Sequence, residues 1–274
     1  MLDPYSRSSR RGLGLMLATL LSALAPGAFA ASESNWDMDP FRAELTNQPS
    51  LQNGAKLYMN YCIGCHSLKF QRYQRTAEDI GIPLDIAEET LIFTGQKIGG
   101  LMESAMPAEK AKAWFGGPPP DLTMVSRVRG SEWLYNYLRA FYIDESRPFG
   151  VNNGVFENVG MPHVLLELQG RVQKGCYQVP MVNEYGGERR DPLVPGKVLT
   201  EEKCDVLKLE EGSGSMTAQE YDSAIFDLVN FLVYVGEPYA LQRQRIGVFV
   251  LLFLVVLFGF AWLLNREYWK DVEH

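Results

Sequence analysis

The sequence predicts a mainly α-helical domain with long loops, followed by one C-terminal transmembrane helix. Apolar residues recur at helical spacing in four segments, whereas the alternating pattern of strands is hard to find. The 25 glycines and 15 prolines gather in connecting stretches, notably residues 115–123 and 184–196. Near the C-terminus, residues 246–264 form an apolar run without a charge.

Four segments of the head are predicted to be helical. They begin at Ser50, Pro107, Ser131 and Thr217. The first carries Cys62 and Cys65 at its end, and Ser50 is its possible cap. The fourth has the clearest ends. Thr217 and Glu220 match a capping box at its start, and Gly236 with Pro238 would stop it shortly before the apolar run.

The two hydrophobic ends of the chain indicate export and membrane anchoring. Residues 1–30 contain a basic head, an apolar run and the cleavage pattern Ala28-Phe29-Ala30, which predict a secretory signal peptide. An uncleaved anchor is the alternative, but this run is short and interrupted by glycine and proline. The C-terminal run can cross a ~30 Å hydrocarbon core, so we expect a span within residues 241–264. Export of the head would make residues 31–240 periplasmic and residues 265–274 cytoplasmic.

The charge balance is acidic. The chain has 26 Lys and Arg against 33 Asp and Glu, a net charge of −7. This balance argues against nucleic acid as a partner and is compatible with a basic protein partner, although most such charge is simply solvated surface.

The stretch "YCIGCHSLKF", residues 61–70, contains the strongest chemical signal. On a helix Cys62 and Cys65 share one face, and His66 is four residues after Cys62. A thioredoxin-like dithiol would need a βαβ pattern and a zinc site two more ligands at comparable spacing, and neither is visible. Cys-x-x-Cys-His is the attachment signature of c-type haem, in which two thioether bonds hold the macrocycle and the histidine ligates iron. We therefore expect one covalently bound haem c.

A methionine is expected as the second iron ligand, since electron-transfer haems usually fill the sixth position with a side chain. Met106 and Met161 each precede a proline, in "SAMPAEK" and "NVGMPHVL", and proline stiffens a loop. Spacing does not choose between them. His163 is a weaker rival.

Two further cysteines, Cys176 and Cys204, are not needed by the haem motif. In an exported chain they are expected to form a disulfide, with a pair of buried free thiols as the alternative.

The whole pattern resembles the cytochrome c1 family, the haem-bearing subunits of bacterial ubiquinol:cytochrome c oxidoreductase, or respiratory complex III. The resemblance rests on blocks in the same order: "GAKLYMNYCIGCHSLKFQRY", "PPPDLTMVSRVRG", "GMPHVL" and the C-terminal "VNFLVYVGEPYALQRQRIGVFVLLFLVVLFGFAWLLNREYWKDV". It covers nearly the whole mature chain and implies a cytochrome c-type haem domain. Residues 170–215 correspond to a variable region.

The resemblance implies a role for each candidate site residue. Cys62 and Cys65 would form the thioether bonds, and His66 and Met161 would ligate the iron. Arg127 would pair with a haem propionate, for which a planar guanidinium is well suited. The haem edge would be lined by Pro118, Pro119 and Pro120, whose alternative role is an ordinary rigid loop.

The resemblance also implies an electron relay without a catalytic residue of its own. The chain would take single electrons from the Rieske iron–sulfur protein and pass them to a soluble cytochrome c. Cytochrome b would be its partner in the bacterial inner membrane, within a dimeric complex. Two other functions remain open: a haem subunit of a periplasmic dehydrogenase or terminal oxidase, and a haem-based ligand sensor with an open sixth position.

Overall fold

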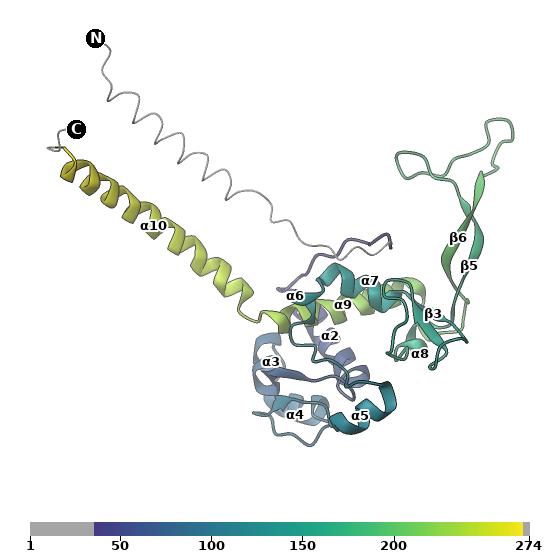
Figure 1. Cartoon of the computed structure of the whole chain (residues 1–274), viewed down its shortest axis with the longest axis horizontal. Coiled ribbons are helices and arrows are strands. Elements are labelled where there is room, and N and C mark those ends of the chain that lie inside the picture. The colour runs from purple at the N-terminus through teal and green to yellow at the C-terminus, as the bar shows by residue number, and fades with distance from the viewer. Residues whose placement is uncertain (1–35, 271–274) are drawn as a thin grey trace, which may run out of the picture. The chain divides into compact units, whose positions relative to one another are not determined.

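The structure, a computed structural model, describes residues 36–270. The predicted signal peptide, residues 1–30, and the last part of the predicted cytoplasmic tail, residues 271–274, lie outside the described residues. The described part of the chain is mainly helical with long loops, as the sequence predicts (Figure 1).

Helices α2 (Gln48–Tyr61) and α9 (Ala218–Gly236) form the centre of the core. The ring centroids of Tyr58 on α2 and Phe231 on α9 are 5.9 Å apart, and both side chains are fully buried. Gly54 permits the close approach, because a Cβ at this position would lie 2.0 Å from the carbonyl oxygen of Asp227. The two helices therefore pack almost backbone to backbone.

Two more helices position the site against α9. The short α6 (Val125–Val128) docks through the Ser126 hydroxyl, which donates to the carbonyl oxygen of Leu232 at 3.0 Å. Helix α7 (Ser131–Arg139) packs beside it, and Tyr221 of α9 donates to the carbonyl oxygen of Leu138 at 2.9 Å. Helix α9 thus supports both elements.

The helix starts agree with the sequence in part. The capping box of α9 is confirmed, since the Glu220 carboxylate accepts from the Thr217 backbone N–H at 2.8 Å and the Thr217 hydroxyl accepts from Glu220 in return. For α2 the predicted cap is wrong. The structure uses Asn47, whose side chain accepts from the Ser50 N–H at 3.3 Å. The predicted helix after Pro107 is present as α5 (Ala108–Phe115).

The sequence predicted no strands, but the described residues contain three antiparallel pairs. These are β1 (Leu68–Arg72) with β2 (Leu101–Met102), β3 (Phe141–Ile143) with β4 (Val151–Asn153), and β5 (Val172–Pro180) with β6 (Thr200–Leu209). Four short helices were also missed: α3 (Tyr73–Ile80), α4 (Leu84–Leu91), α6 and α8 (Leu166–Gln169).

The longest strand pair, β5 and β6, forms a ribbon (Figure 1). A disulfide between Cys176 and Cys204 joins the two strands, so the predicted disulfide is present in the structure. The bond closes the stretch that contains the glycine- and proline-rich residues 184–196.

Helix α10 (Ala240–Tyr268) contains the apolar run. By length and composition it could cross a membrane, with a mean hydropathy of 2.9 over its most apolar window and none of that window buried in the structure. It is longer than the predicted span, residues 241–264, mainly because the polar residues 265–268, which include Arg266, are helical as well.

Candidate haem site

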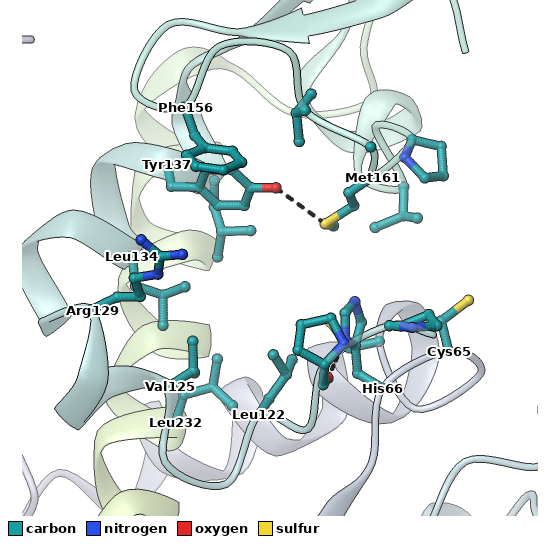
Figure 2. Close-up of a pocket in the computed structure, with 18 of the residues that line it drawn as sticks. Cys65, His66, Leu122, Val125, Arg129, Leu134, Tyr137, Phe156, Met161 and Leu232 are labelled. Carbon is teal, nitrogen blue, oxygen red and sulfur yellow. Dashed lines mark hydrogen bonds between the residues drawn. The ribbon is translucent and has the colours of Figure 1, made fainter. Parts of the chain in front are cut away.

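A cavity of about 370 Å³ lies between the end of α2, the loop that contains Pro118, Pro119 and Pro120, the helices α6 and α7, and the loop after β4 (Figure 2). This volume is within the range of cofactor pockets, about 300–1,000 Å³. Its wall is mostly apolar and includes Leu122, Val125, Leu134, Leu138, Leu228 and Leu232. Such a wall suits a large apolar cofactor and excludes water from it.

The Cys-x-x-Cys-His motif forms a tight turn directly after α2. The backbone N–H groups of Cys65 and His66 both donate to the carbonyl oxygen of Cys62, at 3.0 and 2.8 Å. Both cysteines line the cavity, and neither is in a disulfide. Burial raises the pKa of the Cys62 thiol to about 12 and also raises the pKa of Cys65. Both sulfurs are therefore uncharged at neutral pH, as an apolar cavity requires.

His66 is oriented by a backbone contact. Its Nδ1 lies 2.8 Å from the carbonyl oxygen of Pro120, which can only accept, so Nδ1 carries the proton and Nε2 is the nitrogen left to bind a metal. Burial lowers the pKa of His66, against the opposing effects of Pro120 and Asp121. The imidazole is therefore neutral, the form that ligates iron.

The loop with three prolines is attached to the haem motif. The Asp121 carboxylate accepts from the Lys69 N–H at 2.8 Å, and the Leu122 N–H donates to the carbonyl oxygen of Ser67 at 2.9 Å. Prolines need no partner for a backbone N–H, so they can form an apolar wall without leaving a buried donor unpaired. The wall is made by Pro118, Pro119 and Pro120, all of which line the cavity.

Met161 lies opposite His66. Figure 2 shows the two side chains entering the cavity from opposite sides. The Tyr137 hydroxyl donates to the Met161 sulfur at 3.5 Å, which holds that side chain toward α7. One neutral nitrogen and one thioether sulfur on opposite walls are the donor set of a six-coordinate electron-transfer haem.

The rival ligands have other surroundings. Met106 lies beside Cys65 and Pro118 in a neighbouring hollow. His163 stacks on the Phe141 ring at 4.7 Å, and burial lowers its pKa to about 4. Of the three candidates, all within the described residues, only Met161 lines the cavity.

Arg127 does not lie where the sequence suggested. Its guanidinium pairs with Glu237, at 2.6 Å between Nη1 and Oε2, whereas Arg129 lines the cavity (Figure 2). Two residues along a helix differ by roughly 200°, so the two arginines face opposite directions. The motif "RVR" contains both residues and could not choose between them before the orientation of α6 was known. Arg129 is stacked above Trp133, 5.2 Å from its ring centroid.

Tyr137 was also missed by the sequence reading. It faces the cavity from α7, and its ring stacks on Trp133 with the centroids 4.8 Å apart. Burial raises its pKa, so the hydroxyl stays protonated and can donate to Met161.

Comparisons with known proteins identify the family. The Cytochrome C1 family matches residues 39–272. Cytochrome c1 of Allochromatium vinosum is 48% identical over 259 residues, which cover 94% of this chain and 99% of that protein. A protein of Nitrosomonas europaea named ammonia monooxygenase gamma subunit is 42% identical over 260 residues, with 94% and 99% covered. Cytochrome c1 of Rhodobacter capsulatus is 24% identical over 293 residues, with 94% and 98% covered.

Proposed function

Because the chain belongs to the cytochrome C1 family, we propose that it is the electron-carrying subunit of a quinol:cytochrome c oxidoreductase. In this role it takes single electrons from a Rieske iron–sulfur protein and passes them to a soluble cytochrome c. The observation that carries the proposal is the cavity with Cys62, Cys65 and His66 on one wall and Met161 on the other. A bound haem c would supply one-electron chemistry between ferric and ferrous iron.

The residues of the chain hold, orient and shield this group. Cys62 and Cys65 provide the two sulfurs for thioether bonds, and the Pro120 carbonyl orients His66 for ligation. We assign the propionate contact to Arg129 in place of Arg127, because Arg129 lines the cavity and carries a planar fork of donors. The chain itself forms and breaks no bond in a substrate.

Helix α10 supports membrane anchoring. In the proposed topology it lies in the bacterial inner membrane next to cytochrome b, and the head is periplasmic in one half of a dimeric complex. Its apolar window contains no charge, and Trp262 and Tyr268 near its end suit the aromatic belt of a membrane interface.

The acidic charge supports a basic carrier as electron acceptor. With a net charge of −7, the chain would attract a positively charged cytochrome c, and the encounter rate would fall as salt is added.

A second candidate function follows from the relative in Nitrosomonas europaea. That protein is named ammonia monooxygenase gamma subunit and is 42% identical over nearly its full length. The chain could carry electrons in the same cavity but within another enzyme complex. The haem subunit of a periplasmic dehydrogenase or terminal oxidase belongs to the same group of alternatives, which differ in partner and not in site.

The test is the set of proteins that co-purify with this chain from native membranes in mild detergent, identified by mass spectrometry. Cytochrome b and a Rieske protein, together with reduction of the chain on addition of quinol, are the expected result. An unrelated anchored c-type cytochrome from the same membranes serves as the control for chance co-extraction. A monooxygenase, dehydrogenase or oxidase core in place of cytochrome b would overturn the proposal.

A further inference from the structure

We propose that two buried asparagines of β4, Asn152 and Asn153, are positioning residues that hold the loop carrying Met161 at the correct distance from His66. This inference rests on the proposed function, because it treats Met161 as an iron ligand. It concerns residues 154–160, which connect the end of β4 to the methionine.

The backbone of this loop is held by side chains more than by regular structure. The Val155 and Phe156 N–H groups both donate to Asn153 Oδ1, at 2.9 and 3.1 Å. The Asn158 N–H donates to Asn152 Oδ1 at 2.9 Å. Asn158 itself has a φ of 60°, a left-handed conformation that asparagine tolerates better than most residues. Two side chains therefore determine where the loop turns.

The same asparagines connect the loop to the rest of the core. Asn153 Nδ2 donates to the carbonyl oxygen of Tyr137 at 2.8 Å, and the hydroxyl of Tyr137 contacts the Met161 sulfur. Asn152 Nδ2 donates to the Asp144 carboxylate at 3.0 Å. Asn153 thus binds both the start of the loop and the residue that touches its end.

Burial makes these contacts difficult to replace. Asn153 is 0% exposed and Asn152 is 7% exposed. If the Asn153 side chain is removed, the N–H group of the buried Val155 loses its acceptor, and water cannot readily take its place. The Phe156 and Asn158 N–H groups, whose hydrogen bonds are partly buried, lose acceptors on Asn153 and Asn152 respectively. The loop would then move toward solvent to satisfy them, and Met161 would move with it. A haem ligand on such a loop depends on the asparagine hydrogen bonds for its position. In the same way, a metal-bound histidine depends on the hydrogen-bond partner of its other ring nitrogen.

The variant Asn153→Ala tests this role in the full chain in its native membranes. Asn230→Ala is the matched control, because Asn230 is also 0% exposed. Its side-chain amide forms hydrogen bonds with Glu44 and Ser50, and neither residue lines the cavity. Four properties are measured: covalent haem content, the sulfur-to-iron charge-transfer band of the ferric form, the reduction potential, and carbon monoxide binding by the ferrous form.

The expected result separates positioning from general stability. Asn153→Ala should keep its haem, lose most of the charge-transfer band and have a lower reduction potential. The ratio of open to methionine-ligated iron, measured by carbon monoxide binding, should rise roughly tenfold. Asn230→Ala should match the wild-type chain in all four properties. If Asn153→Ala keeps the band and the potential, as the control does, the asparagine is only structural and the inference is wrong.

Two further measurements cover the case in which Asn153→Ala does not accumulate. Asn152→Ala removes only the bonds to Asn153, Asn158 and Asp144, and a smaller change in the same direction is expected. Hydrogen exchange on the wild-type chain should show the N–H groups of Val155, Phe156 and Asn158, which donate to the two asparagines, protected at least roughly tenfold relative to the same groups in an unstructured peptide. Exchange at equal rates would overturn the inference without any variant.

A separate variant distinguishes a wrong iron ligand from a wrong role of the asparagines. Met161→Leu, measured in the same way, should lose the charge-transfer band. If that variant keeps the band, Met161 is not the ligand and the proposed site is wrong. If it loses the band while Asn153→Ala keeps it, the site stands and only the role of the asparagines is wrong.

Discussion

Replacing Gly54 by alanine should separate the two central helices. A Cβ at Gly54 would lie 2.0 Å from the Asp227 carbonyl oxygen and 2.6 Å from the Phe231 Cβ, whereas real Cβ contacts are essentially never below 3.0 Å. Since the nearest obstacle is helix backbone, no change of rotamer relieves the clash. Helices α2 and α9 must therefore move apart by at least roughly 1 Å, the difference between 3.0 and 2.0 Å.

The expected loss in the free energy of unfolding of Gly54→Ala is the sum of two opposing effects. Overpacking a core by one methyl group costs about 3 kcal/mol at the upper end, which is appropriate where backbone must move. Alanine in place of glycine inside a helix returns about 1 kcal/mol. The net loss of about 2 kcal/mol corresponds to a fall of roughly 4–8 °C in the unfolding midpoint for a chain of this size. The same movement shifts Leu228 and Leu232 of the cavity wall away from the haem motif.

The assay is thermal unfolding of the full chain in mild detergent, followed by near-ultraviolet circular dichroism. Gly99→Ala is the matched control, because a Cβ at Gly99 would meet no atom within 4 Å and its φ is not left-handed. We expect the control to unfold at the wild-type temperature. A destabilisation of about 1 kcal/mol would already lower the unfolding midpoint by at least about 2 °C. If the midpoints of Gly54→Ala and Gly99→Ala differ by less than this, α2 and α9 do not approach each other as closely as in the structure.

Three further predictions follow from the site and from the helix ends. Met161→Leu should lower the reduction potential and allow carbon monoxide to bind ferrous iron. Met106→Leu, the other methionine before a proline, should change neither the potential nor carbon monoxide binding. If redox titration shows the lower potential in Met106→Leu instead, Met106 is the ligand. Replacing Cys176 and Cys204 by serine should speed proteolysis within residues 184–196 and leave the potential unchanged, since the ribbon contributes no residue to the cavity wall; an altered potential would contradict this separation. The pKa of Glu220 is lowered by the Thr217 N–H and hydroxyl, so its contribution to stability is present above its unfolded pKa and lost as pH falls through the folded one. The difference in unfolding midpoint between the wild-type chain and Glu220→Ala should therefore be constant near pH 7 and shrink below about pH 4, and a difference that grows in acid would refute the cap.

Signals that act over a few residues could be recognised before the structure was known. The capping box at Thr217 and Glu220 involves groups one helical turn apart, and the turn from Cys62 to His66 closes on its own backbone. The predicted cap of α2 failed for an equally local reason. Asn47 is a cap of similar strength, and Pro49 is tolerated in a first turn, so the helix begins earlier than Ser50.

The ribbon could not be predicted from periodicity. Most residues of β6 are exposed, so no alternation of apolar and polar side chains marks its two faces. Pairing with β5 and the disulfide between Cys176 and Cys204 hold it, and both depend on residues far apart in the chain. The disulfide was predictable from the export signal, but its strands were not.

The sequence by itself determined the chemical signals of this protein: a c-type haem motif, methionines before prolines, a predicted export signal, an acidic charge balance and an apolar run. These features depend on residue type and on spacing along one segment. Spacing left Met106 and Met161 open, and only the family resemblance favoured Met161, which the tertiary structure places on the cavity wall. Only the tertiary structure decided that Arg129 and not Arg127 enters the cavity, and that buried asparagines bond the loop before Met161. The reason is physical, because each choice depends on the rotation of a helix or the path of a loop against distant segments, and identical residue types two positions apart can face opposite sides.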